Sequence, residues 1–226
     1  SMFFLPKSKK LLDFIYTKAG MLRSKDQSKW IIDKYSPKKI LEIGFGYGGG
    51  LVFWNKEGYN INGIEPDLKM AERINKIVGK KIAYPLKFEK LDKKNKYDLV
   101  ILSHVFEHLD NIDDFFKKLK EIQPEKGYLF LEVPNCQNKI VLVESKENVH
   151  HLHHFTMETL TKVIKDHGYS IIKKETLISK IDHIIRGKSI FSRSSKMIKV
   201  LLSRKKSVPE KSSNADCIRI LAIRNN

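Results

Sequence analysis

Lys39-Ile40-Leu41-Glu42-Ile43-Gly44-Phe45-Gly46-Tyr47-Gly48-Gly49-Gly50 is the stretch that decides the fold of this 226-residue chain. Residues 40–43 are apolar except for Glu42, a pattern typical of a buried strand. The glycines that follow permit a tight turn, because a residue without a Cβ reaches positive φ and lets the backbone approach a ligand. The apolar residues 51–54 then favour a helix. A strand, a glycine loop and a helix together form a nucleotide cradle, in which N–H groups at the start of the helix face the ligand.

The spacing of these glycines fits two ligand-binding motifs. Gly44, Gly46 and Gly49 satisfy G-x-G-x-x-G, a weak signature of dinucleotide binding. With Glu42 in front, the loop reads E-x-G-x-G-x-G through Gly48, which resembles motif I of class I S-adenosylmethionine (SAM) dependent methyltransferases. A carboxylate at this place suits the positive sulfonium and ammonium groups of SAM better than it suits a pyrophosphate. The loop therefore favours SAM, and a nicotinamide enzyme is the alternative.

The composition is that of an ordinary folded protein, with 41% hydrophobic and 31% charged residues. Two cysteines make no disulfide framework, residues 2–5 are too short for a signal-peptide core, and no run is as long as a membrane span. We therefore expect a cytoplasmic protein with one domain, residues 1–226. The net charge of +17 predicts attraction to an anionic partner without choosing among nucleic acid, membrane and acidic substrate.

An acidic residue follows the second predicted strand, Asn60–Ile64, in the sequence Glu65-Pro66-Asp67. Glu65 lies 21 positions after Gly44, where this architecture places an acid that binds the ribose hydroxyls. Carboxylate oxygens accept hydrogen bonds from both hydroxyls, so the residue type suits that role. Asp67 is predicted to cap the next helix, which should end at Gly79.

The strongest strand signal is residues 97–103, which are apolar enough to be buried on both faces. It runs into His104-Val105-Phe106-Glu107-His108. In a doubly wound sheet, ligands bind outside the carboxyl ends of the strands. We therefore expect His104, Glu107 and His108 near the reacting group. Four more histidines fall within residues 150–154, just before Thr156, which is predicted to cap a helix.

Two segments lie outside this pattern. Residues 1–36 are predicted to form two helices, the second opened by the capping-box sequence of residues 24–27. Residues 177–214, between a strand at 169–173 and a closing strand at 215–224, are predicted to form a basic helical insertion with two amphipathic helices. Within it, ten lysines and arginines stand against Asp182 and Glu210. Residues 177–211 are therefore expected either to contact an anionic membrane surface or phosphorylated substrate, or to form a helical flap over the active site.

Five motifs in order carry a wider resemblance: the glycine loop from Glu42, residues 65–67, 97–100, 103–108 and 131–135. With them the chain resembles a class I methyltransferase, and it is similar in particular to the bacterial subgroup that methylates small molecules, quinones and sugars. The resemblance implies an α/β, Rossmann-like, seven-stranded and mostly parallel sheet. Its last strand would be antiparallel and inserted beside strand five, with helices on both faces. The resemblance also implies SAM contacts from a set of residues: Glu42, Gly44, Phe45, Gly46, Gly48, Glu65, Pro66, Glu89, Ser103 and His104.

The expected reaction is methyl transfer to a hydroxyl of a sugar, a glycan precursor in polysaccharide biosynthesis, or another small molecule. An alcohol acceptor must lose its proton, and histidine titrates in the range needed to take it. The candidates are His104, His108, His151 and His154, of which His108 and His154 are favoured, and Glu107 could orient one of them. His150 and His154 would share a face in a helix and invite a metal ion. Since Thr156 reads as the helix start, that stretch is expected to be extended, and no metal site is predicted.

Two other functions remain open from the sequence. The charge suggests an RNA methyltransferase. However, the strand at 97–103 runs into Ser-His rather than the Asn/Asp-Pro-Pro-aromatic sequence of enzymes that methylate amino nitrogens, and no RNA-binding motif is present. Nucleic acid is therefore the less favoured partner. The second alternative is a membrane-associated SAM-binding protein without catalysis. It would place the chain at the inner face of the membrane. The sequence does not determine the oligomeric state.

Overall fold

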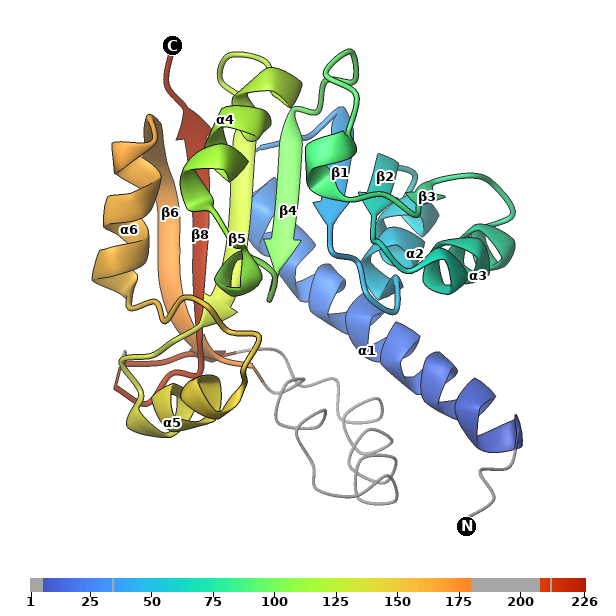
Figure 1. The fold of residues 1–226 in the computed structure, drawn as a ribbon, viewed down its shortest axis with the longest axis horizontal. Coiled ribbons are helices and arrows are strands. Elements are labelled where there is room, and N and C mark those ends of the chain that lie inside the picture. The colour runs from blue at the N-terminus through green and yellow to red at the C-terminus, as the bar shows by residue number, and fades with distance from the viewer. Residues whose placement is uncertain (1–5, 34, 180–207, 212) are drawn as a thin grey trace.

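The computed structural model describes residues 6–33, 35–179, 208–211 and 213–226, and its centre is one mixed sheet (Figure 1). The strand order is β3-β2-β1-β4-β5-β8-β6-β7. Strands β1 to β5 pair in parallel, whereas β8 pairs antiparallel with both β5 and β6. The predicted Rossmann-like sheet, with its last long strand inserted beside β5, is confirmed. The strands are β1 Lys39–Ile43, β2 Asn60–Ile64, β3 Ala83–Tyr84, β4 Leu99–Ser103, β5 Tyr128–Pro134, β6 Tyr169–Ile178, β7 Val208–Pro209 and β8 Cys217–Arg224.

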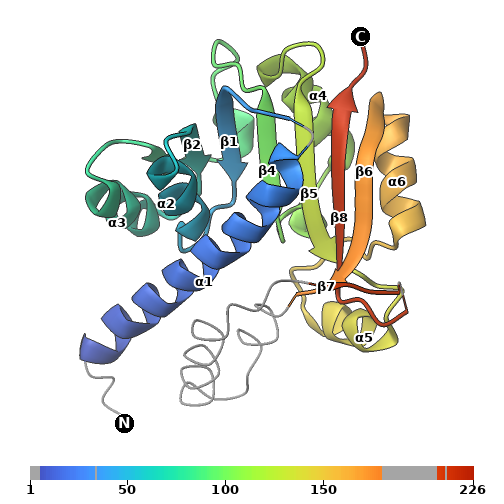
Figure 2. The same ribbon diagram turned by 180° about the vertical axis from the view of Figure 1, so that it is seen from behind.

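Helices cover both faces of the sheet. Figure 2 shows α1 running across one face, on which α2 and α3 also pack, while α4 and α6 cover the opposite face seen in Figure 1. None of the described helices is long and apolar enough to span a membrane. The helices are α1 Pro6–Ile32, α2 Gly49–Lys56, α3 Leu68–Val78, α4 Ile112–Ile122, α5 Lys139–Glu147 and α6 Met157–Asp166, with the short 3₁₀ turns η1 Phe88–Lys90 and η2 Phe106–His108.

Local sequence signals set several of these boundaries. The carboxylate of Asp67 accepts hydrogen bonds from the N–H groups of Lys69 and Met70 and so starts α3, which ends at Gly79 with φ 76°. Thr156 caps α6 in a reciprocal capping box with Thr159. These interactions satisfy N–H groups that the first helical turn leaves without partners. The predicted starts of both helices are confirmed.

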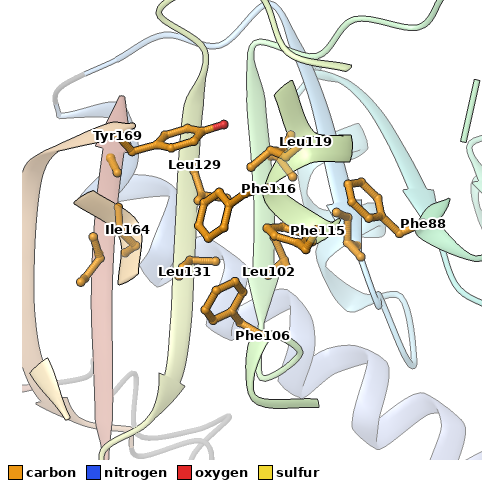
Figure 3. Close-up of a cluster of buried hydrophobic side chains, with 14 of the residues drawn as sticks. Phe88, Leu102, Phe106, Phe115, Phe116, Leu119, Leu129, Leu131, Ile164 and Tyr169 are labelled. Carbon is orange, nitrogen blue, oxygen red and sulfur yellow. The ribbon is translucent and has the colours of Figure 1, made fainter. Parts of the chain in front are cut away.

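The core has two halves because the central strands are buried on both faces. Along β4, Leu99 and Ile101 pack with α1, α2 and α3, whereas Val100 and Leu102 point to the opposite half. Figure 3 shows that second half, where aromatic side chains of α4 meet Leu129 and Leu131 of β5. Burial on both sides explains why the strand lacks polar alternation in the sequence.

The prediction of two helices in the N-terminal region is wrong: the structure has one helix of 27 residues, α1. Residues 24–27, predicted as a capping box, lie inside this helix. The side chains of Asp26 and Gln27 contact residues of the sheet instead of capping the start of a helix. Gln27 donates a hydrogen bond to Ser103 over 2.9 Å, and Asp26 accepts one from Arg219 over 2.9 Å. Gly20 lets α1 cross α2 closely, since a Cβ there would lie 3.0 Å from the Cα of Gly49.

The C-terminal half also departs from the prediction. Strand β6 continues to Ile178, and Val208–Pro209 pairs with its end as the additional strand β7, so the predicted insertion at 177–214 begins in a strand and contains a second short one. The helices predicted within it fall on residues 180–207, which lie outside the described residues. Strand β3 is only two residues long, and the helix α5 was not predicted at all. The lengths of β3, β6 and β7 are set by pairing with a neighbouring strand, which leaves little trace in the local sequence.

A buried ion network ties α1 to the sheet. Arg219 of β8 donates to Glu132 of β5 through Nε and to Asp26 of α1 through Nη2, and its Nη1 lies 3.5 Å from Glu175 of β6. Burial works to raise the pKa of the Glu132 carboxyl, but the charges of Arg219, His104 and Arg23 outweigh it and lower that pKa to about 2. The pairing is therefore needed to keep the Glu132 charge inside the protein.

We expect Arg219→Met to lower the free energy of unfolding by about 3–5 kcal/mol, because it leaves Glu132 buried without its partner. Urea denaturation at pH 7 measures this change. The matched control is Lys162→Met, which removes an exposed ion pair with Asp166 and should cost less than about 1 kcal/mol. The double variant Glu132→Gln/Arg219→Met should recover part of the loss. A double variant no more stable than Arg219→Met would show that packing, not the stranded charge, dominates.

Candidate active site

The glycine loop lies at the carboxyl ends of the parallel strands. Strand β1 ends at Ile43, and Ile43 is in register with Ile64 of β2 and with Leu102 of β4, so the residues that follow all three strands share one edge. Gly46 has φ 49°, a conformation that favours glycine, and a Cβ built on it meets no atom within 4 Å. The middle of the loop therefore faces open space instead of packed side chains.

Glu42 is buried beside this loop, with 8% of its surface exposed. Its carboxylate occupies the space over Gly50, the second residue of α2, where a Cβ would lie 2.4 Å from its oxygens, so a larger residue there would force the Glu42 side chain to move. Oε2 of Glu42 is buried without a hydrogen-bond partner. Burial raises the pKa of this carboxyl to about 8, although the charge of Arg23 works in the opposite direction.

A cavity of about 250 Å³ opens between the loop and α1. Its lining includes Glu42 and Gly46 from the loop side, Arg23 and Gln27 from α1, and Ser103 from the end of β4. Glu65, directly after β2, is half-buried beside it and accepts a hydrogen bond of 3.1 Å from the N–H of Gly46. Glu42 from β1, Glu65 from the end of β2 and Gln27 from α1 thus converge around the loop, because the carboxyl ends of the parallel strands meet at one edge of the sheet.

A second cavity, of about 530 Å³, lies next to the first and is lined by histidines and carboxylates. Arg23 lines both cavities, and the consecutive residues Ser103 and His104 line one each. His104 has φ 55°, unusual for a residue with a side chain. Its Nδ1 lies 3.7 Å from Glu107, and its Nε2 lies 3.7 Å from Glu132. The boundary between the two cavities is therefore formed by Arg23 and the Ser103–His104 pair.

The histidine-rich loop closes one side of the second cavity. The N–H groups of Leu152 and His153 donate to the backbone carbonyl of Glu107, which holds the loop against η2. The rings of His108 and His151 meet edge to face with centroids 4.7 Å apart. Burial lowers the pKa of His151, and the neighbouring histidines lower it further, while Glu107 works in the opposite direction. Residues from β4, η2 and a loop some 40 positions later are thus brought together.

The predicted site residues divide into three groups. Glu42, Gly44, Phe45, Gly46 and Ser103 line the first cavity, with Glu65 beside it, and His104, Glu107 and His108 line the second. Pro66 and Glu89 are exposed, and the space at Gly48 is filled by Ile74 instead of a ligand. His154 is exposed, and its Nδ1 lies 2.9 Å from the hydroxyl of Ser145.

Sequence reasoning missed several side chains that line the two cavities, among them Arg23, Gln27 and Ser145. The first two come from α1, and no signal in the sequence connects them with the end of β4. Ser145 lies on α5, whose start is marked by Asn138 as a capping residue, since its side chain accepts from the N–H of Ile140. That cap was the one local signal that could have revealed α5.

Solved structures of methyltransferases share this fold. A SAM-dependent methyltransferase from Archaeoglobus fulgidus superposes with a TM-score of 0.64 at 19% identity, over 93% of this chain and 99% of that one. The plantazolicin methyltransferase BpumL, solved with S-adenosylhomocysteine and a pentazolic desmethylPZN analogue, gives 0.57 at 16% identity, over 95% and 86%. The cyclopropane synthase MmaA2 from Mycobacterium tuberculosis gives 0.58 at 14%, over 83% and 78%. At such identities the likeness concerns the fold. No curated protein sequence matches the chain significantly.

The fold and the loop define a class I SAM-dependent methyltransferase. A family model for a methyltransferase domain matches residues 25–174, more than half of the chain, and the chain belongs to that family. Its cofactor is SAM, and the residues present fit it. The open space at Gly46 leaves room for a ligand, and the unpartnered oxygen of Glu42 offers an acceptor to a cationic group.

We expect the variant Glu42→Gln to change the pH dependence of stability in the ligand-free protein. The pKa of about 8 in the folded state lies above the ordinary value of 4.5, so the folded chain binds more protons between these values, and this group destabilises the fold as pH rises through that window. The stability of Glu42→Gln relative to wild type should therefore increase from pH 5 to pH 8, by at most about 1.4 kcal/mol per pH unit.

Urea unfolding at several pH values measures this difference. Glu72→Gln, at an exposed position on α3, is the control and should follow the wild-type curve. Parallel curves for Glu42→Gln and wild type would mean that Glu42 is ionised in the folded, ligand-free protein at neutral pH.

Proposed function

We propose that this enzyme transfers the methyl group of SAM to a hydroxyl of a small molecule, such as a sugar or a glycan precursor. The observation that supports it is the pair of adjoining cavities, which meet at Arg23 and the Ser103–His104 pair. One contains the glycine loop, and the other is polar and rich in histidine and carboxylate. A hydroxylated acceptor can satisfy such groups, whereas an apolar acceptor would leave them without hydrogen bonds.

The proposed cofactor contacts come from the loop and the strand ends. The carboxylate of Glu65 accepts hydrogen bonds from the ribose hydroxyls, and the open backbone at Gly46 lies against the nucleoside. Glu42 offers its carboxylate to the cationic part of the ligand. When bound, SAM supplies a methyl group already activated by the sulfonium charge, so the protein contributes alignment and removal of one proton.

We propose His104 as the group that takes the acceptor proton. It stands at the boundary between the cavities, and Glu107 and Glu132 lie 3.7 Å from its two ring nitrogens. The negative charge of these carboxylates stabilises the imidazolium formed when the ring accepts a proton. His108 lies further along η2, and His154 is exposed and bound to Ser145, so neither is as well placed at the boundary.

The remaining assignments follow from this proposal. Residues 1–226 act as one methyltransferase domain, with α1 closing both cavities and the segment from 180 to 207 outside the described residues. An RNA acceptor or a membrane surface is supported only by the net charge of +17. Binding of the full chain to RNA and to anionic vesicles across a salt series would test these two alternatives.

We expect Glu65→Ala to weaken SAM binding by about 1–3 kcal/mol, the cost of losing a charged hydrogen-bond acceptor. Isothermal titration calorimetry with SAM measures this change, and Glu72→Ala on the exposed face of α3 is the matched control. The same titration with NAD should show no binding. If Glu65→Ala binds SAM as tightly as wild type, the ribose hydroxyls are held elsewhere.

The methyl acceptor is sought by mass spectrometry with a panel of sugar nucleotides, small alcohols and small amines. With the best hydroxyl acceptor, His104→Ala should lower turnover about 100-fold or more and leave SAM affinity nearly unchanged, because it removes proton transfer and not cofactor contacts. His150→Ala, whose side chain is exposed, is the control. Methylation of amines alone would contradict the proposed reaction. Loss of turnover in His154→Ala but not in His104→Ala would move the base to His154.

A further inference from the structure

Glu107 lies beside His104, but this contact provides no hydrogen bond to its buried carboxylate. The residue is 1% exposed, and both of its side-chain oxygens are buried without a hydrogen-bond partner. Nδ1 of His104 lies 3.7 Å from the Glu107 carboxylate and Nε2 of His108 lies 4.0 Å from it, both beyond hydrogen-bond distance. Burying a charged group without close partners costs several kcal/mol, and a cation bound beside Glu107 would supply the missing partner.

Two histidines next to Glu107 present the ring nitrogen that a metal ion needs. Nδ1 of His108 lies 2.7 Å from the backbone carbonyl of His150, which can only accept, so Nδ1 carries the proton and Nε2 carries the lone pair. Nδ1 of His151 lies 2.8 Å from the hydroxyl of Ser145, which also lies 2.9 Å from Nδ1 of His154. When the hydroxyl donates to His154 it accepts from Nδ1 of His151, and Nε2 of His151 then carries the lone pair. Metal-bound histidines have this arrangement, with the second ring nitrogen held by a neighbouring acceptor.

We propose that Glu107, His108 and His151 form a binding site for a divalent transition-metal ion of the zinc class. One ligand atom from each residue lies within 4.8 Å of the others. Ligand bonds to zinc are about 2.0–2.2 Å long, so small movements of these side chains bring all three atoms to one ion. Two imidazoles and one carboxylate select zinc, cobalt or iron over magnesium, which prefers oxygen ligands alone.

The place of this site indicates what the ion does. All three residues line the second cavity, and three protein ligands leave a coordination position open, as in catalytic zinc sites. With an ion bound, the open position would take an oxygen of the acceptor and lower the pKa of its hydroxyl, and His104, whose Nδ1 lies 3.7 Å from Glu107, would receive the proton. This part rests on the proposed methyl transfer to a hydroxyl, whereas ion binding itself does not.

The test is metal binding by the full chain, freed of any affinity tag and stripped of metal with a chelator. Elemental analysis after incubation with Zn²⁺ should find one ion per chain, and Co²⁺ should give the visible absorption of a nitrogen- and oxygen-ligated site. Titration with Zn²⁺ should show at least about tenfold weaker binding in His151→Ala and in His108→Ala. His150→Ala should bind as wild type, because its backbone carbonyl remains and its exposed ring lies outside the cluster.

The outcomes separate this proposal from the proposed function. No binding of Zn²⁺ or Co²⁺ by a stripped, folded wild-type chain would overturn the site, as would equal binding by wild type and His151→Ala. The same holds if His150→Ala and His154→Ala lose the ion while His151→Ala keeps it. A chain that binds the ion at this cluster but methylates no hydroxyl would retain the metal site and remove only the proposed reaction.

Discussion

The buried pairing of Arg219 with Glu132 is the interaction on which the site depends. Through the same guanidinium, Arg219 also holds Asp26, and so it fastens the middle of α1 to the carboxyl ends of the strands. The polar residues of that helix, Arg23 and Gln27, consequently stand over the end of β4 and close the two cavities. A helix attached only by apolar contacts could slide along the sheet, whereas ionic contacts from one buried arginine allow one position.

The site holds three buried carboxylates in three different environments. Glu132 has full ionic pairing, which outweighs burial and keeps its pKa at about 2. Glu42 is buried with its Oε2 lacking a hydrogen-bond partner, and burial raises its pKa to about 8. Glu107 has histidines near it but no hydrogen bonds to its oxygens. In a chain with a net charge of +17, the carboxyl groups of Glu42 and Glu107 lie where the cofactor and the metal ion are proposed to bind, and a cationic ligand beside Glu42 would favour its ionisation.

Local patterns in the sequence predicted the elements that local interactions build. The apolar residues before Gly44, the caps at Asp67 and Thr156, and the buried strand ending at Ser103 were all found in the structure. Each depends on contacts within a few residues or on burial of a short run. The single long helix α1, the length of β6 and the presence of β7 depend on contacts between distant segments, and they were predicted wrongly or not at all.

By itself the sequence determined that a strand with a carboxylate runs into a glycine loop at the start of a Rossmann-like fold. This was possible because the acid and the glycines that adopt positive φ lie within a few consecutive residues. Only the tertiary structure decided which of the eight histidines line a cavity with Glu107 and which, like His154, do not. Consecutive residues of an extended loop project in different directions, so their spacing along the chain carries no information about which ring meets a helix or strand from another part of the fold.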